Sequence, residues 1–286
     1  MSEDASADQA GPADVAGPAG GEVVRRHRLS TRIWHWINVV ALLFMLGSGL
    51  MIFNAHPRLY WGEYGANFDR AWLVIGATAS GEGTMRVGNV HLRTTGLLGV
   101  WNDAAGNRQY HAFPGWATIP SHYDLAGARI WHLGVAWVLA FGLLLYLIWS
   151  LANGHLRRDI HITAREWRPS HILHHIGQHV RLRFPTGAAA LRYNVLQKLA
   201  YASVLFVLLP LIIVTGLAMS PGMDARWSWL TILWGGRQSA RSVHFLCAFG
   251  LVAFFVVHIV MVVLAGPFNE VRSMITGKYR LPRERK

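Results

Sequence analysis

The sequence contains a single cysteine, Cys247, among its 286 residues. One cysteine excludes an internal disulfide framework, a four-cysteine iron–sulfur cluster and a covalent C-x-x-C-H haem attachment built from this chain alone. Cys247 lies within a hydrophobic run, where a small apolar packing residue is expected. Any redox chemistry of this chain therefore has to use other residue types.

Charged residues are also scarce, at 15% of the chain against 52% hydrophobic residues, which is typical of a membrane protein. Four runs contain no charged residue and have roughly the 20 residues that a helix needs to cross the bilayer. None shows the alternation of apolar and polar residues found in membrane β-barrels. We therefore expect an all-α membrane protein, a four-transmembrane-helix bundle with a long outer loop between helices 1 and 2. The expected spans are residues 33–53, 130–151, 199–219 and 244–264.

The segments outside these runs indicate the domain boundaries and the topology. Residues 1–24 are rich in Ala, Gly, Asp and Pro and predict a disordered cytoplasmic tail, followed by a membrane domain at 25–280 and a basic cytoplasmic tail at 281–286. With four spans, the two ends and the loop 152–198 share one side, which holds 18 of the 27 Lys and Arg residues. The positive-inside rule places that side in the cytoplasm. This topology accounts for most of the positive charge, so no nucleic-acid partner is expected.

Four histidines lie inside the spans, at His35, His132, His244 and His258. Ionisable side chains in a membrane are costly and usually functional, although a single histidine can simply hydrogen-bond a neighbouring helix. The 14 residues from His244 to His258 correspond to a rise of about 21 Å on nearly one helix face. The topology then predicts two pairs, His35 with His258 at cytoplasmic depth and His132 with His244 at outer depth.

Two histidine pairs on facing helices indicate two bis-histidine haem b sites, with the four histidines as axial ligands of the haem iron. A zinc or mononuclear iron site typically has more protein ligands, often including cysteine or carboxylate. Arg32, Arg129 and Arg241 each precede one of these histidines by three residues, one helical turn closer to water. There they are candidates for pairing with haem propionates. Interfacial snorkelling is the alternative for all three, and the topology signal also explains Arg32.

Longer stretches resemble the bacterial cytochrome b561 family over roughly residues 25–280. These stretches are "YNVLQKLAY" (193–201), "TGLAM" (215–219), "RSVHFLCAFGLVAFFVVH" (241–258) and "NEVRSMITGKY" (269–279). The family includes the di-haem cytochrome b subunits of hydrogenases, formate dehydrogenases and thiosulfate reductases. The resemblance implies a multi-pass protein of the bacterial inner membrane that carries electrons between a quinone pool and a periplasmic redox partner, such as a molybdopterin oxidoreductase.

The resemblance also implies a quinone site beside the cytoplasmic haem. In the formate dehydrogenase members, the Asn of a Tyr-Asn motif and the haem-ligand His of span 4 contribute to that site, and these positions are Asn194 and His258 here. The Gly that follows this Asn by two residues in those members is Leu196 in this chain, which departs from the pattern. Asn194 also suits the N-cap of the third span, which is the structural alternative.

The two long loops carry further signals. "LLGVWNDAAGNRQYHAF" (97–113) predicts a hairpin that turns across residues 104–107, and the many aromatic residues of the outer loop favour an ordered cap or docking surface. In the middle loop, "HILHHIGQHV" (171–180) places His171, His174, His175 and His179 at helical spacing. We interpret this segment as an amphipathic surface helix rather than as a metal site.

Two other functions are compatible with parts of this pattern. A stand-alone enzyme of the superoxide:quinone type would also need membrane haems, but the long outer loop favours a protein partner. A non-redox membrane anchor would not need four histidines inside its spans.

Overall fold

The structure is a computed structural model that describes residues 21–181 and 193–281. Within these ranges, four helical segments are long and apolar enough to cross a membrane: α1 (Leu29–Phe53), α2 (Leu125–Ala152), Val195–Met219 and α8 (Arg237–Ala265). The expected four-helix membrane region is therefore confirmed. Each helix begins four to seven residues before the corresponding hydrophobic run. Hydropathy marks the part in hydrocarbon, whereas a helix can continue into the polar interface.

The third span changes its helical geometry along its length. It comprises α4 (Val195–Ser203), a π-helical turn η4 (Val204–Leu208) and α5 (Leu209–Met219). Pro210 lies in the first turn of α5. Because proline has no backbone N–H, it cannot continue the regular ladder of the preceding helix, which accounts for the wider turn before it.

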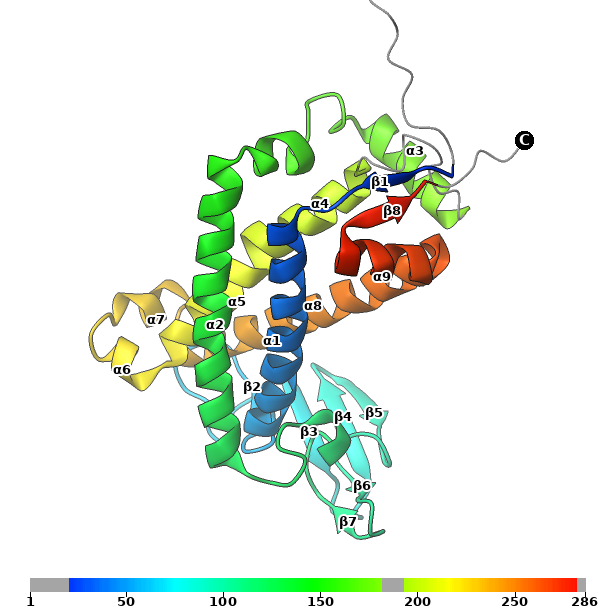
Figure 1. The fold of residues 1–286 in the computed structure, drawn as a ribbon. Helices are drawn as coiled ribbons and strands as arrows, with labels where there is room; N and C mark the ends of the chain where they lie inside the picture. The colour runs from blue at the N-terminus through cyan, green and yellow to red at the C-terminus, as the bar shows by residue number, and fades with distance from the viewer. Residues whose placement is uncertain (1–20, 182–192, 282–286) are drawn as a thin grey trace, which may run out of the picture.

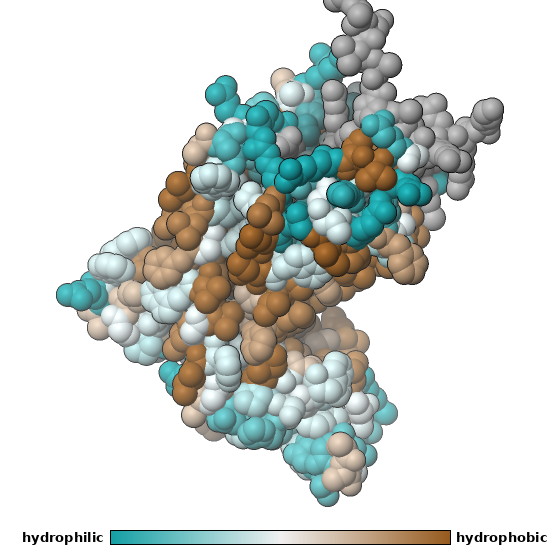
Figure 2. Space-filling view, in the orientation of Figure 1, coloured by the Kyte–Doolittle hydropathy of each residue, from teal (hydrophilic) through white to brown (hydrophobic). Residues whose placement is uncertain are grey.

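The helices pack as α1 against α2 and α5 against α8, as Figure 1 shows. Their core is a cluster of buried side chains from α2, α5 and α8: Leu139, Leu143, Leu209, Ile212, Cys247 and Leu251. Cys247 is thus a buried packing residue, as expected. Figure 2 shows apolar residues over the outer surfaces of α1 and α2, with hydrophilic residues gathered at the two ends of the bundle. This distribution suits helices that contact lipid along their middle.

The outer loop contains a small sheet that the all-α expectation did not include. Strands β2 (Arg58–Leu59), β3 (Leu73–Ala77), β4 (Gly83–Val87) and β5 (Val90–Arg93) form an antiparallel sheet in the order β2-β3-β4-β5. The expected hairpin is confirmed, since β6 (Trp101–Asn102) pairs with β7 (Arg108–Gln109). A short helix η1 (Gly115–Ala117) follows. We call this side of the bundle the loop end (Figure 1).

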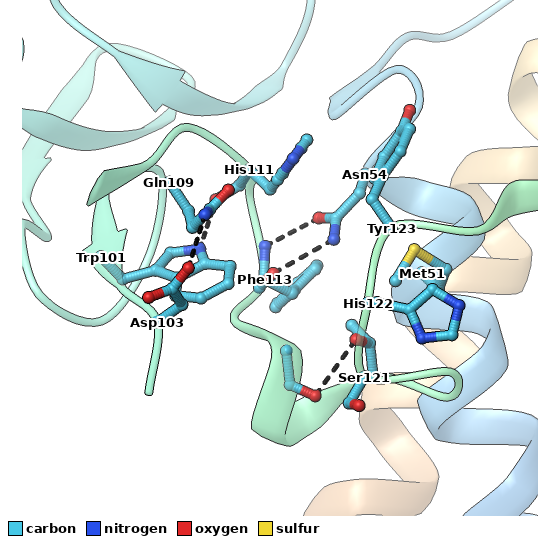
Figure 3. A pocket seen from close by; sticks show the side chains of 12 residues that line it. Met51, Asn54, Trp101, Asp103, Gln109, His111, Phe113, Ser121, His122 and Tyr123 are labelled. Carbon is cyan, nitrogen blue, oxygen red and sulfur yellow. Dashed lines mark hydrogen bonds between the residues drawn. The ribbon is translucent and has the colours of Figure 1, made fainter. Parts of the chain in front are cut away.

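The outer loop is fastened to the membrane helices by specific hydrogen bonds. At the end of α1, the Asn54 side chain accepts from Phe113 N at 2.7 Å and donates to Phe113 O at 3.1 Å (Figure 3). At the start of α8, Ser242 Oγ donates to Tyr60 O at 2.5 Å and accepts from Trp72 Nε1 at 3.0 Å. The loop is therefore an ordered cap, positioned by both helices.

The opposite side, which we call the termini end, brings the two ends of the described chain together. Strand β1 (Val23–Arg25) pairs antiparallel with β8 (Lys278–Arg280), above α9 (Pro267–Thr276). The expected boundary of the N-terminal tail at residue 24 is therefore wrong, because its partner strand holds Val23 and Val24 in a sheet. The rest of the expected tails, residues 1–20 and 282–286, lies outside the described residues.

The remaining elements lie in the two shorter connections. The middle loop contains a π-helical turn η2 (Leu156–Ile160) and α3 (Pro169–Val180), which confirms the expected helix there. In α3 the ring centres of His171 and His175 lie 4.6 Å apart, but the described residues contain no group of three or more side chains placed to bind a metal. The side chain of His179 lies outside the described part. Helices α6 (Pro221–Asp224) and α7 (Trp229–Leu233) connect α5 to α8.

Candidate functional site

The four histidines of the spans lie in two facing pairs, and the pairs are those expected from depth. His35 of α1 faces His258 of α8, with ring centres 6.3 Å apart and planes at 56°. His132 of α2 faces His244 of α8, again with ring centres 6.3 Å apart and planes at 57°. The first pair lies toward the termini end and the second toward the loop end. Helix α8 contributes one histidine to each pair.

Hydroxyl groups orient both histidines of the loop-end pair. His132 Nδ1 lies 3.0 Å from Ser48 Oγ, and His244 Nδ1 lies 3.1 Å from Thr215 Oγ1. The same hydroxyls lie 2.5 Å from Phe44 O and 2.6 Å from Leu211 O, to which they donate. Each hydroxyl oxygen therefore accepts from the ring N–H at Nδ1. This leaves the lone pair on Nε2, the nitrogen available to a metal.

A glycine follows each of these hydroxyl residues. A Cβ added at Gly49 would lie 3.3 Å from His132 Cε1, and one at Gly216 would lie 3.4 Å from His244 Cε1. Both imidazoles thus pack directly on a helix backbone, at a Ser-Gly step of α1 and a Thr-Gly step of α5. Neither Ser48 nor Thr215 was predicted from the sequence as a partner of a histidine. The sequence feature that could have identified them is a hydroxyl residue followed directly by glycine, which occurs in two of the spans.

The termini-end pair has different surroundings. His35 Nδ1 and the Asn38 side-chain oxygen, one turn apart on α1, are buried without a hydrogen-bond partner among the described residues. Phe254 stacks on His258, with ring centres 5.8 Å apart and planes at 15°. Tyr201 of α4 lies 6.4 Å from Phe254 and 5.3 Å from Tyr193, ring centre to ring centre. A row of aromatic rings therefore connects His258 with the start of α4.

The geometry of each pair fits two axial ligands of one haem iron. A metal–imidazole bond of about 2 Å, plus about 1 Å from nitrogen to ring centre, puts the centres of two opposed imidazoles about 6 Å apart. Both observed separations, 6.3 Å, agree with this distance. Two neutral nitrogen donors on facing helices are also the ligand set of a bis-histidine haem. The two histidine pairs therefore fit bis-histidine haem, the cofactor that the sequence pattern indicates.

Comparison with known families agrees with this chemistry. The family description "Prokaryotic cytochrome b561" matches residues 26–277. The chain belongs to this family. Its members are membrane proteins that bind haem b and transfer electrons. A putative protein-methionine-sulfoxide reductase subunit YedZ1 from Azospira oryzae is 24% identical over 243 residues, covering 85% of this chain and 92% of the relative. No solved structure matches this cytochrome b561 family member.

The three arginines expected at haem propionates do not share one environment. Arg32 donates from Nε to Met274 O at 3.3 Å and also to Ile275 O, at the C-terminus of α9. Arg241 donates to His56 O at 2.6 Å in the outer loop. Arg129 is exposed at the start of α2. The guanidinium groups of Arg32 and Arg241 thus hold neighbouring segments in place. Carbonyl groups at a helix C-terminus attract a cation, which explains the position of Arg32.

Asn194, the candidate quinone residue, is the N-cap of α4. Its side chain accepts from Gln197 N at 3.0 Å, and Gln197 Oε1 accepts from Asn194 N at 3.1 Å. This reciprocal arrangement is a capping box. The helix-capping role expected as the alternative for Asn194 is therefore confirmed. The row of aromatic rings that leads to His258 begins at the preceding residue, Tyr193.

A cavity of about 260 Å³ opens at the loop end, between the end of α1 and the β6–β7 hairpin (Figure 3). Its wall includes His111, whose ring stacks on Tyr123 at 4.5 Å between centres. Burial lowers the pKa of His111, so its imidazole is neutral at physiological pH. Met51 also lines the cavity, three residues after Ser48 on α1. The cavity thus lies about one helical turn from the residue that orients His132.

Proposed function

We propose that this cytochrome b561 family member binds two haem b groups and carries electrons across the bacterial inner membrane. Quinone would react at the cytoplasmic side, and a periplasmic oxidoreductase subunit would exchange electrons at the outer side. The observation that carries this proposal is the presence of two facing histidine pairs of equal separation, toward opposite ends of one bundle.

In this proposal His35 and His258 hold one haem iron, and His132 and His244 hold the other. Haem b supplies reversible one-electron iron chemistry when it is bound. Helix α8 sets the distance between the sites, since 14 residues of regular helix separate its two histidines by about 21 Å. Ser48 and Thr215 keep the outer histidines in the tautomer that presents Nε2. Arg129 is the foremost candidate for pairing with a propionate, because its side chain is exposed.

The proposed orientation rests on the distribution of basic residues. The side that carries both termini and the middle loop holds 18 of the 27 Lys and Arg residues, whereas the side with the outer loop holds 9. The positive-inside rule therefore supports a cytoplasmic termini end and a periplasmic loop end. The same assignment puts His35 and His258 at cytoplasmic depth.

The quinone site is proposed beside His258, near the start of α4. The row Tyr193, Tyr201, Phe254 and His258 offers flat apolar faces on which a quinone ring can pack. The Asn194 amide would supply a hydrogen-bond donor to a quinone carbonyl, while its oxygen stays with the helix cap. Leu196 makes this site differ from that of the formate dehydrogenase relatives.

The periplasmic partner is proposed to dock on the outer loop. Several large aromatic side chains of this loop are mostly exposed, among them Tyr64, Phe68 and Trp116. Aromatic residues are enriched at protein interfaces. The relative from Azospira oryzae is named as a subunit of a putative reductase. We infer by analogy that this chain also serves a reductase or another oxidoreductase subunit, such as a molybdopterin enzyme, rather than acting alone.

A quinone-site inhibitor distinguishes the two sides. We expect it to shift the spectrum or potential of the haem that is lost in His258→Ala, and Asn194→Ala to weaken that shift while both haems remain bound. Asn194→Asp is the matched control for folding, because its carboxylate keeps the cap acceptor but lacks the amide donor. It should retain the stability of α4 and still weaken the response. A shift confined to the haem lost in His132→Ala would place the quinone site at the loop end instead.

A further inference from the structure

Helix α9 turns its polar side toward the protein, the reverse of a helix on a soluble domain. Glu270 forms a two-oxygen ion pair with Arg26, at 3.1 and 3.2 Å. Asn269 bonds the backbone of Arg280 through both its amide nitrogen and its oxygen, and Ser273 is fully buried. These contacts join α9 to the β1–β8 sheet. The side chains of Asn269, Glu270 and Ser273 are therefore engaged on the inner side.

The outward side of α9 is apolar and has a shallow hollow. Phe268, Val271 and Ile275 occupy one face at helical spacing and are 93%, 42% and 55% exposed. With Pro267, Thr276 and Arg272 they line a depression of about 470 Å³. Among the side chains that line it, Arg272 donates from Nη2 to Asn269 Oδ1 at 3.3 Å, while its Nε is buried and has no hydrogen-bond partner among the described residues. An apolar hollow with one unpaired guanidinium N–H suits an amphiphile with an anionic head group.

The position of α9 places this hollow at the membrane interface. The helix follows α8 directly at Gly266, and the exposed Val263 and Leu264 of the last turn of α8 continue its apolar surface. At its other end, Met274 O accepts from Arg32 Nε and from Trp36 Nε1 in the first two turns of α1. Arginine and tryptophan typically occupy the head-group level of a bilayer. The outward face of α9 is therefore expected at the boundary between the hydrocarbon core and the lipid head groups.

We propose that α9 is an interfacial helix that binds an anionic phospholipid. The Arg272 guanidinium donates to the lipid phosphate, and the acyl chains lie along Phe268, Val271 and Ile275. Lys278 and Arg280, both exposed in the following strand, add positive charge, while Glu270 of the same helix is paired with Arg26. An inverted amphipathic helix with a basic rim is the feature that binds anionic bilayer surfaces.

The first test measures the depth of α9 and requires no haem. In a Cys247→Ala background, a nitroxide label is attached at Phe268→Cys, with Lys278→Cys as the matched position on the hydrophilic side. In bilayers of phosphatidylcholine and phosphatidylglycerol, the label at 268 should collide more with oxygen than with an aqueous nickel chelate, and the label at 278 should show the reverse. Equal exposure of both labels to the nickel chelate would overturn the proposal.

The second test measures lipid selectivity on the full chain. Native mass spectrometry after mild delipidation should show retained phosphatidylglycerol in preference to phosphatidylcholine. Arg272→Gln should lower that retention about fivefold, the effect of removing one basic residue near an anionic surface. Arg272→Lys should keep much of it, and Arg157→Gln, an exposed arginine elsewhere at the termini end, should change nothing. Unchanged retention in Arg272→Gln, or displacement of the lipid by inorganic phosphate, would overturn the proposal. Neither readout depends on quinone or on the redox partner.

Discussion

At the scale of single residues, the most informative contacts are those behind the loop-end histidines. Ser48 and Thr215 come from different spans, yet each places a hydroxyl oxygen about 3 Å from a histidine Nδ1, at 3.0 and 3.1 Å. A metal-ligating histidine commonly has such a partner on its other nitrogen, which fixes the tautomer and raises ligand basicity. The termini-end pair lacks this device at His35, whose Nδ1 has no partner among the described residues. The two proposed haem sites should therefore differ in midpoint potential.

Removing these hydroxyls tests their role. Ser48→Ala and Thr215→Val should leave the fold intact, raise the midpoint potential of the loop-end haem, and weaken its binding by about 10- to 100-fold. The physical reason is that an imidazole without the Nδ1 hydrogen bond is a weaker electron donor to ferric iron. Potentiometric titration measures the shift, and Ser150→Ala removes a buried serine of α2 as the control. Unchanged potentials in both variants would show that the hydroxyls only pack.

His27 gives a prediction for pH. Burial, with the neighbouring Arg26 cation, lowers the pKa of His27 from 6.5 to about 4. Between these values the unfolded chain binds a proton that the folded chain does not, so stability falls as pH drops from 6.5 toward 4. His27→Asn should flatten this part of the pH profile. The measurement is thermal unfolding or limited proteolysis of the β1–β8 region across that range. If the stability of His27→Asn falls with pH as steeply as that of the parent protein, another titratable group causes the fall.

The sequence predicted the four histidines and their pairing but not the contacts of the arginines. Histidine depth follows from position within a hydrophobic run, which is local information. The partners of Arg32 are carbonyls of Met274 and Ile275, more than 240 residues away in the chain. Likewise Arg241 reaches His56, across a separation of 185 residues. Spacing to the nearest histidine could not reveal which distant carbonyls would be within reach.

At the scale of helices and strands, α1 and α2 approach closely where a glycine faces an aromatic ring. A Cβ at Gly142 would lie 2.5 Å from Trp34 Cζ3, and Trp34 in turn stacks on Tyr146 at 5.2 Å between ring centres. Trp34 is the residue before His35. The close spacing of α1 and α2 near the termini-end pair therefore depends on glycine, which has no side chain, at position 142.

Gly142→Ala should destabilise the chain by about 1–3 kcal/mol, the usual cost of overpacking a close contact. Because Trp34 must move, the haem held by His35 should be retained less well than the other. Gly134→Ala on the same helix is the control, since a Cβ there meets nothing within 4 Å. Thermal unfolding and haem content measure both effects. Equal stability and equal haem content of the two variants would show that Trp34 can move aside without destabilising the protein.

The sequence predicted helices better than strands for a physical reason. A run of about 20 apolar residues identifies a span without reference to the rest of the chain. The β6–β7 hairpin was also local, since Gly106 supplies the left-handed turn at φ 84°. In contrast, β1 pairs with β8 across the whole chain, and β2 has only two residues. Strands this short depend on pairing and packing for their formation, which sequence pattern alone does not contain.

At the scale of the whole molecule, α8 joins the two ends of the bundle. It is a regular helix over 29 residues, whereas the third span is interrupted by a π-helical turn. Both histidine pairs therefore share one continuous element, and their separation is set by its rise. The outer loop is fastened to the start of α8, and α9 follows its end. Under the proposed function, each end of the bundle thus offers its own surface for a partner, a protein at the loop end and lipid and quinone at the termini end.

Two haems at opposite depths are expected in this cytochrome, and haem content is the decisive measurement. A pyridine haemochrome assay on purified protein, made with ample haem supply, should give two haems b per chain. His132→Ala and His244→Ala should each lose one and the same haem, and His35→Ala and His258→Ala should each lose the other, as distinguished by their spectra and potentials. One haem or none in the parent protein, or loss of the same haem from His35→Ala and His132→Ala, would be incompatible with two haems at opposite depths.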